Sequence, residues 1–438
     1  MIEKSIVKVK NDDIVSSPVT AVGLVSTLDR IDWTSCKSIS KNLLIAYRSA
    51  CRNSLIYSIG RWQKPSDMTL VARRILRDRP GQLVFIDHTP MPDALLLALQ
   101  RLDPSYNPQI NIHVYGDFIR NLREWKAIEP LLVGRRIRFL CASTRQTRLL
   151  KNLIAQPRAV CRVPFPVDTQ VFRPRSLVRR DWRERLGVQN DDFLITYTGR
   201  FSLQKNLFLL GQGFERAAAL DSRFHLALAV QFDDLGAPLF GLHQRKGQMR
   251  REWLSFFRGI PRSIRERIHL MEDLSSHDLV GLYNATDLFC SLSTYHDEDF
   301  GMSPAEAMAC GTPCALANWG GFWDFKKQNP DHCQLFPVEI RQGRFLPRSP
   351  FWRHFQGLAK LRRSRRDRAL CSRRLRAHFS IESVAQELGE QLKMKYPVFS
   401  GFSKEFKPLH RALDKKAPFP RGASRQGLYG QIYRAYFD

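Results

Sequence analysis

The chain has 438 residues, 43% of them hydrophobic, which is enough to form two domains with separate cores. No run of 18 apolar residues could cross a membrane, no secretory leader is recognisable, and the nine cysteines include no C-x-x-C pair, so we expect a cytoplasmic protein with reduced thiols. The net charge of +27 excludes an electrostatically neutral surface and predicts an anionic partner, which could be nucleic acid, a membrane surface or a substrate.

Apolar runs bounded by turns alternate with helix-period segments along the chain, which predicts βα repeats and a mostly parallel sheet. In the first half the predicted strands are Ala21–Ser26, Leu55–Ile59, Leu83–Asp87, Ile110–Val114, Arg138–Cys141 and Ala159–Val163. In the second half they are Phe193–Tyr197, His225–Val230, Ile268–Met271, Leu288–Leu292 and Cys314–Ala317. Between Phe172 and Asp192 the chain is polar and rich in arginine, so we place an inter-domain linker there.

The predicted strand Phe193–Tyr197 leads into Thr198-Gly199-Arg200, and Lys205-Asn206 opens the next predicted helix. The carboxyl ends of parallel strands face the crevice where doubly wound folds bind ligands. Arg200 and Lys205 would bring two positive charges suited to a diphosphate. The alternative is ordinary surface basicity, in a chain with 69 lysines and arginines.

Two carboxylates, Glu298 and Glu306, bracket a turn that leads directly into a predicted helix. Ser303 is the expected N-cap, Pro304 the first helical residue, and Gly311 the stop. The free N–H groups of the first turn suit a phosphate, and the flanking carboxylates suit neutral hydroxyls, so the pattern describes a nucleotide-sugar site. The simpler interpretation is a capping box, in which Glu306 reaches back to the Ser303 N–H.

The string from Glu298 to Pro313 resembles the E-x7-E signature of the glycosyltransferase family 4 group of GT-B enzymes, in its spacing and in its Phe-Gly and Ala-Met-Ala-Cys-Gly-Thr-Pro runs. Gly199, Arg200, Lys205 and Asn206 match the family's G-R-x-x-x-x-K-N pattern. The resemblance implies the α/β GT-B fold, with two doubly wound Rossmann-like domains facing across a cleft. The expected division is an acceptor-side domain at 1–178, a nucleotide-sugar-binding domain at 179–378, a closing helix at 379–396 and a basic aromatic tail at 397–438.

The resemblance also implies roles for single residues. Arg200 and Lys205 would stabilise the leaving nucleoside diphosphate, Glu298 would hold hydroxyls of the donor sugar, and Glu306 those of the ribose. The implied donor-binding set is Gly199, Arg200, Lys205, Glu298, Phe300, Gly301, Met302, Ser303 and Glu306. The implied catalytic set is His113, Arg200, Lys205 and Glu298, with no protein nucleophile assigned.

Two histidines of the first half are candidates for contact with the donor sugar. By the resemblance, His113 at the end of the predicted strand Ile110–Val114 would bind the sugar or orient the reacting centre, and His88 is the second candidate. From the residues alone, an isolated strand histidine is more often a core residue.

The acidic run Asp297-Glu298-Asp299 could be a metal-binding D-x-D motif. Adjacent strand-like side chains alternate in direction, and the surrounding string resembles a metal-independent pattern, so we expect no metal and no cofactor, the nucleotide-sugar being a substrate. The segment Gln231–Gly236 replaces the family's Gly-x-Gly loop beside the nucleotide base, and the base is left open.

Between Arg341 and Ser380 there are thirteen lysines or arginines against one acid, Asp367. We favour contact of this 341–380 segment with an anionic membrane over nucleic acid, because no nucleic-acid module is recognisable; a purely solvated basic face is the third option. The tail beyond Tyr396 could be ordered chain on the first domain, a membrane-touching segment, or flexible chain.

The sequence therefore predicts a metal-independent retaining hexosyltransferase, peripheral on the cytoplasmic face of a membrane. It would move a sugar from a UDP- or GDP-linked donor to a glycan or lipid-linked acceptor in cell-surface polysaccharide synthesis. One alternative is a nucleotide-sugar hydrolase or epimerase on the same fold. The other is a non-catalytic protein that binds a polyanion or nucleic acid.

Overall fold

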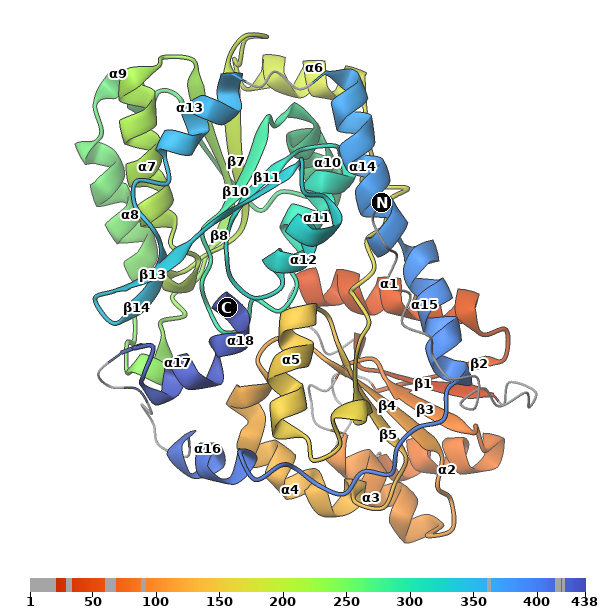
Figure 1. The fold of residues 1–438 in the computed structure, drawn as a ribbon. Coiled ribbons are helices and arrows are strands. Elements are labelled where there is room, and N and C mark those ends of the chain that lie inside the picture. The colour runs from red at the N-terminus through yellow and green to blue at the C-terminus, as the bar shows by residue number, and fades with distance from the viewer. Residues whose placement is uncertain are drawn as a thin grey trace, which may run out of the picture.

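The computed structural model in Figure 1 describes residues 21–28, 34–59, 68–87, 92–360, 364–413, 419 and 422–438. His88 lies outside the described residues. The described chain forms two parallel sheets of six strands each. The first sheet has the spatial order β2 (Ser54–Ser58), β1 (Val22–Ser26), β3 (Gln82–Phe85), β4 (Gln109–Val114), β5 (Ile137–Cys141) and β6 (Val160–Arg162). The second has the order β12 (Cys333–Phe336), β11 (Cys314–Ala317), β10 (Leu288–Ser291), β7 (Phe193–Phe201), β8 (Phe224–Phe232) and β9 (Ile268–Glu272).

Helices cover both sheets, as the βα alternation predicts (Figure 1). Around the first sheet lie α1 (Thr34–Ala50), α2 (Met68–Asp78), α3 (Asp93–Leu102), α4 (Leu122–Leu132) and α5 (Thr144–Leu153). The second half carries α6 (Ser176–Arg185), α7 (Leu207–Leu220), α8 (Gln248–Gly259), α9 (Arg262–Arg265), α10 (Ser276–Ala285), α11 (Met302–Ala309), α12 (Phe322–Gln328), α13 (Arg353–Lys360) and α14 (Arg365–Phe379). The C-terminal part adds α15 (Ile381–Lys393), α16 (Phe406–Leu413), α17 (Leu428–Ile432) and α18 (Arg434–Phe437).

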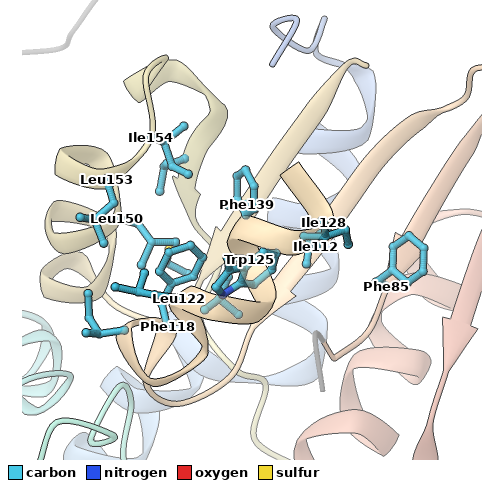
Figure 2. Close-up of a cluster of buried hydrophobic side chains, with 14 of the residues drawn as sticks. Phe85, Ile112, Phe118, Leu122, Trp125, Ile128, Phe139, Leu150, Leu153 and Ile154 are labelled. Carbon is cyan, nitrogen blue, oxygen red and sulfur yellow. The ribbon is translucent and has the colours of Figure 1, made fainter. Parts of the chain in front are cut away.

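The strands are buried on both faces, which explains why they are recognisable as continuous apolar runs. Figure 2 shows part of the first core, in which Phe118 and Trp125 lie beside Phe139 of β5. The rings of Phe118 and Trp125 stack with centroids 4.7 Å apart. All the predicted strands are present with bounds shifted by a few residues, whereas β12 and the antiparallel hairpin β13 (Val338–Arg341) and β14 (Arg344–Pro347) were not predicted.

The arginine-rich stretch expected to be a linker is instead helix α6, and that prediction is wrong. Arg179 and Arg183 of α6 both pair with Asp287, and the Trp182 side chain is buried. Trp182 lies so close to Gly281 of α10 that a Cβ at that glycine would be 1.9 Å from its indole nitrogen. The arginines therefore hold a helix against the second sheet's layer, and polar composition alone does not distinguish such a helix from a loop.

The basic 341–380 segment is partly used inside the fold. Arg368 donates hydrogen bonds to the carbonyl oxygens of Thr286, Asn284 and Cys310, at the C-terminal ends of α10 and α11. Arg344 of β14 donates to the Leu203 carbonyl oxygen. Exposed arginines of this segment include those at positions 365, 366 and 373 on α14.

The C-terminal segment is packed onto both halves of the molecule (Figure 1). Helix α15 lies against α1, and the following chain pairs Val398 with Arg136 and Phe402 with Ile154. Phe399 is fully buried in the first core. Of the three options for the tail, ordered chain is therefore the one observed in its described part, and it reaches the second half as well. None of the helices in the described chain is both long enough and apolar enough to span a bilayer.

Candidate functional site

The carboxyl end of β7 brings two basic side chains to the edge of the second sheet. Arg200 lies near the end of β7, and a short turn at Leu203–Lys205 precedes α7, with Asn206 at the N-cap in the left-handed conformation (φ 56°). The helix thus begins one residue later than the predicted Lys205-Asn206 opening, and β7 runs on to Phe201. The turn aims Lys205 toward the loop between β10 and α11.

Both basic side chains pair with carboxylates. Lys205 Nζ lies 2.7 Å from Glu298 Oε2, and Arg200 contacts Asp233 (3.0 Å) and Asp297 (3.4 Å). Burial alone would lower the pKa of Lys205, but the adjoining Glu298 carboxylate outweighs it and raises that pKa. Arg200 shows the same balance: burial opposes the charge, and Asp297 and Asp233 raise its pKa. Two cations and three carboxylates therefore share this site.

Helix α11 begins earlier than predicted. Gly301, with φ 103°, is the N-cap, and the helix runs from Met302 to Ala309, so the prediction of Ser303 as N-cap and Pro304 as first helical residue is wrong. A Cβ at Gly301 would lie 2.7 Å from the Phe322 ring, so only glycine fits this approach. The N–H groups of the first turn point out of the helix, as its geometry requires.

The end of α11 agrees with the prediction that Gly311 stops it. Gly311 has φ 81° and its N–H donates to the Met308 carbonyl oxygen, while the Thr312 N–H donates to that of Ala307. This pair of bonds is a Schellman motif.

Glu306 is not part of a capping box. Its carboxylate accepts a hydrogen bond from the Tyr283 hydroxyl (3.2 Å), which also bonds Thr198 at the end of β7 (2.6 Å). Burial raises the Glu306 pKa to about 7, with Tyr283 partly offsetting the shift. This carboxylate lies one turn into α11, on the side that faces β7.

The acidic run after β10 sends its three carboxylates to different partners, as expected from alternating directions. Asp297 pairs with Arg200, Glu298 with Lys205, and Asp299 accepts a hydrogen bond from the Gly116 N–H (2.7 Å). Burial raises the pKa of Asp299 to about 7. Because Gly116 follows β4, this bond joins the two halves beside the basic pair.

His113 of β4 is fully buried, and its Nε2 lies 2.8 Å from the Tyr47 hydroxyl of α1. Burial lowers the His113 pKa to about 3, so the ring is neutral. The predicted role of His113 at the donor sugar stays a prediction, and this environment is that of a core histidine. The nearby group that does join both halves is Asp117, three residues after β4.

Asp117 belongs to a buried cluster that the sequence analysis missed. It accepts a hydrogen bond from the Tyr433 hydroxyl of the tail (2.8 Å), and the His296 ring lies 3.6 Å from its carboxylate. Burial raises the Asp117 pKa to about 7, and burial lowers that of His296 well below its usual value. Tyr429, Tyr433 and Tyr436 recur at helical spacing, a pattern that could have indicated a packed helix in the tail.

The family of glycosyl transferases group 1 has a model that matches residues 178–330. A D-inositol 3-phosphate glycosyltransferase of Xylanimonas cellulosilytica is 33% identical over 189 residues, which are 42% of this chain and 41% of the relative. A mannosylfructose-phosphate synthase of Agrobacterium fabrum is 28% identical over 158 residues, 36% of this chain and 32% of that protein. The chain thus spans less than half the length of these curated relatives.

Solved structures extend the likeness to the whole fold. HepE of Anabaena, in complex with UDP and glucose, superposes with a TM-score of 0.58 at 11% identity, covering 85% of this chain and 99% of that one. A glycosyltransferase from Rickettsia africae gives a TM-score of 0.63 at 13% identity, with 85% and 98% covered. The predicted GT-B fold is confirmed. Residues 178–330 belong to the glycosyl transferases group 1 family, within a chain whose two parallel sheets form a GT-B fold.

Proposed function

We propose that the protein is a retaining glycosyltransferase that moves a sugar from a UDP- or GDP-linked donor to a glycan or lipid-linked acceptor in cell-surface polysaccharide synthesis. The observation that carries the proposal is the meeting of Arg200, Lys205, Glu298 and Glu306 around the start of α11. HepE of Anabaena, which has the same fold, is a structure in complex with UDP and glucose, and this supports a nucleotide-sugar donor.

In this proposal the leaving diphosphate lies between the basic pair and the first turn of α11. Lys205 and Arg200 would neutralise charge that develops on the diphosphate as the glycosidic bond breaks, and the helix N–H groups would add to this stabilisation. Glu298 and Glu306 would accept hydrogen bonds from sugar and ribose hydroxyls. No metal enters this scheme, because the cationic side chains and the helix terminus supply the positive potential.

Ligand binding has to compete with carboxylates already present. Asp233 occupies the loop where the resemblance expects Gly-x-Gly, and it holds Arg200 at 3.0 Å. A diphosphate would displace this contact, so Asp233 weakens nucleotide binding in the proposed mechanism. The pair is partly exposed, and its strength is therefore modest, about 0.2–1 kcal/mol.

Calorimetric titration with UDP and GDP in the presence of EDTA tests the donor site. We expect one diphosphate to bind the wild type, Lys205→Ala to weaken it about tenfold or more, and Asp233→Asn to strengthen it by about two- to fivefold. Lys151→Ala, which removes an exposed lysine on α5, is the control for net charge. Binding that needs a divalent ion, or an unchanged affinity in Lys205→Ala, would overturn the assignment. Rapid consumption of donor without acceptor would instead indicate hydrolysis.

We also propose that the protein attaches to the membrane surface through exposed arginines of the 341–380 segment, such as those on α14. Each basic residue near an anionic surface contributes about 1 kcal/mol. Because Arg368 and Arg344 are used inside the fold, the attachment would be weaker than the count of charges in this segment suggests.

A further inference from the structure

A pocket of about 430 Å³ lies between α7, the β13–β14 hairpin and the segment that leads into α13. Its wall includes Ser202 and Asn206, which flank Lys205 in the sequence, but Lys205 itself is not among the lining residues. The volume falls in the range of pockets that bind small molecules, about 300–1,000 Å³. The pocket is therefore large enough for a ligand of its own, separate from the donor diphosphate.

The charge of this pocket is one-sided. Arg216 of α7, Arg341 of β13 and Arg344 of β14 line it, and its lining includes no aspartate or glutamate. Arg344 is largely buried and donates to two neutral oxygens, the Leu203 carbonyl (2.9 Å) and the Asn206 side chain (2.7 Å). Within the described part of the chain, no carboxylate forms an ion pair with any of the three arginines. A buried guanidinium without a counter-ion costs free energy, which an anionic ligand would recover.

The pocket also holds polar atoms without partners. The Ser202 side chain is 1% exposed and its hydroxyl has no hydrogen-bond partner among the described residues; the same is true of the buried indole nitrogen of Trp352. Both residues line the pocket, together with the Phe208 ring. Native structures leave few buried polar groups unsatisfied, so these two atoms are candidates to bond a ligand. The aromatic rings would pack against its less polar part.

We propose that this pocket binds a small phosphorylated molecule, with the phosphate held by Arg216, Arg341 and Arg344 and the carbon skeleton against Phe208 and Trp352. A phosphate monoester carries close to two negative charges at pH 7 and has three acceptor oxygens, which matches three guanidinium groups better than a single carboxylate does. The proposal is independent of the donor site, because none of its five residues contributes to the proposed diphosphate contacts.

The pocket is nevertheless linked to the donor site. The Asn206 side chain accepts from Arg344 and donates to the Leu292 carbonyl and the Thr294 hydroxyl, just before the acidic run. A phosphate that draws Arg344 toward itself would loosen this side chain and the turn that carries Lys205. Any such coupling is reciprocal, so UDP would change the affinity for the phosphorylated ligand by the same factor as the ligand changes that for UDP.

Calorimetric titration with glucose 6-phosphate, and with glucose as the uncharged control, tests the proposal. We expect the wild type to bind glucose 6-phosphate but not glucose, and the Arg216→Ala/Arg341→Ala double variant to lose about tenfold or more in affinity. Both arginines are exposed at the rim, so the variant keeps its core. The control Arg366→Ala/Arg373→Ala removes the same charge from exposed positions on α14 and should bind as the wild type does.

The two proposed sites can be told apart by crossing variants and ligands. Lys205→Ala should keep glucose 6-phosphate binding and lose UDP binding, whereas the Arg216→Ala/Arg341→Ala variant should still bind UDP. The proposal is overturned if the wild type does not bind glucose 6-phosphate, if glucose binds equally well, or if the double variant binds like the wild type. Binding to phosphatidylglycerol vesicles that requires Arg216 and Arg341, without binding of glucose 6-phosphate, would assign the pocket to a lipid headgroup and also overturn the soluble ligand.

Discussion

Glu306 shows how one buried carboxylate records the demands of its site. It is enclosed by α10 and α11 with a tyrosine hydroxyl as its hydrogen-bond donor, and burial raises its pKa to about 7. Such an environment penalises the charged form of the unliganded protein. A group of ligand hydroxyls would supply the hydrogen bonds that a buried carboxylate needs, which suits the proposed contact with a ribose.

The raised pKa makes Glu306 a pH-dependent cost to stability. Between pH 4.5 and 7 the unfolded chain has lost this proton while the folded protein retains it, so wild-type stability falls as pH rises through this window. Because Glu306→Gln cannot ionise, we expect its unfolding free energy relative to the wild type to rise by up to about 3 kcal/mol from pH 4.5 to 7. Urea denaturation at both pH values measures this difference, with the exposed Glu184→Gln as control. A pH-independent difference would mean that Glu306 is already ionised.

At this scale the sequence predicted the partners better than the geometry. Arg200, Lys205 and Glu298 were singled out, and the structure brings them together. The contribution of Asp233 could not be predicted, because its carboxylate comes from a loop that departs from the family pattern and reaches Arg200 only through the folding of β8 beside β7. His113 was chosen by its position at a strand end, but a strand end does not reveal which face is covered by α1.

Among the elements, the packing of α6 on α10 most clearly exceeds what the sequence predicted. Trp182 and Gly281 are about a hundred residues apart, and their contact is the reason a polar stretch becomes a helix. Local composition carried no signal of this contact. Similarly, the helix start at Gly301 was missed because Ser303 and Pro304 satisfy the usual preferences for an N-terminus, while the close approach of Phe322 is a tertiary effect.

The glycine of that contact gives a test of element packing. Gly281→Ala would gain up to about 1 kcal/mol of helix propensity but would push a Cβ into the Trp182 indole, so we expect a net destabilisation of about 1–3 kcal/mol. Gly357→Ala on α13 is the matched control, because a Cβ there meets nothing within 4 Å and the change should be neutral or stabilising. Thermal or urea unfolding of both variants decides. Equal effects of the two substitutions would show that α6 is not held where the structure has it.

Across the whole molecule, the tail joins the two halves. The Tyr436 carbonyl oxygen accepts hydrogen bonds from Arg145 of α5 (2.7 Å) and from the Gly320 N–H of the second half (2.9 Å). Tyr433 adds its bond to Asp117. The overall GT-B architecture was predictable from βα alternation and the E-x7-E resemblance, but a tail outside the resemblance carried no such signal. The proposed domain boundaries stay a prediction.

Removing one of these bonds should loosen the two halves. In Arg145→Met the side chain keeps most of its volume but cannot donate to Tyr436, so we expect a loss of about 1–3 kcal/mol in unfolding free energy. Hydrogen exchange should also become faster in α18 and around Gly116. Arg148→Met, at an exposed position of the same helix, is the control. Unchanged exchange in α18 would show that the tail is held without this contact.

Trp319 is placed to sense all of these regions. Its fully buried indole donates a hydrogen bond to the Tyr295 carbonyl oxygen (2.6 Å), beside the acidic run, and its ring lies 5.1 Å from that of Phe345 on β14 and stacks on Phe437 of the tail. One side chain therefore touches the donor loop, the hairpin that lines the arginine pocket, and the tail. In protein labelled with 5-fluorotryptophan, its fluorine resonance, identified by a Trp319→Phe variant, would report on UDP, a phosphorylated ligand and tail movement in a single spectrum.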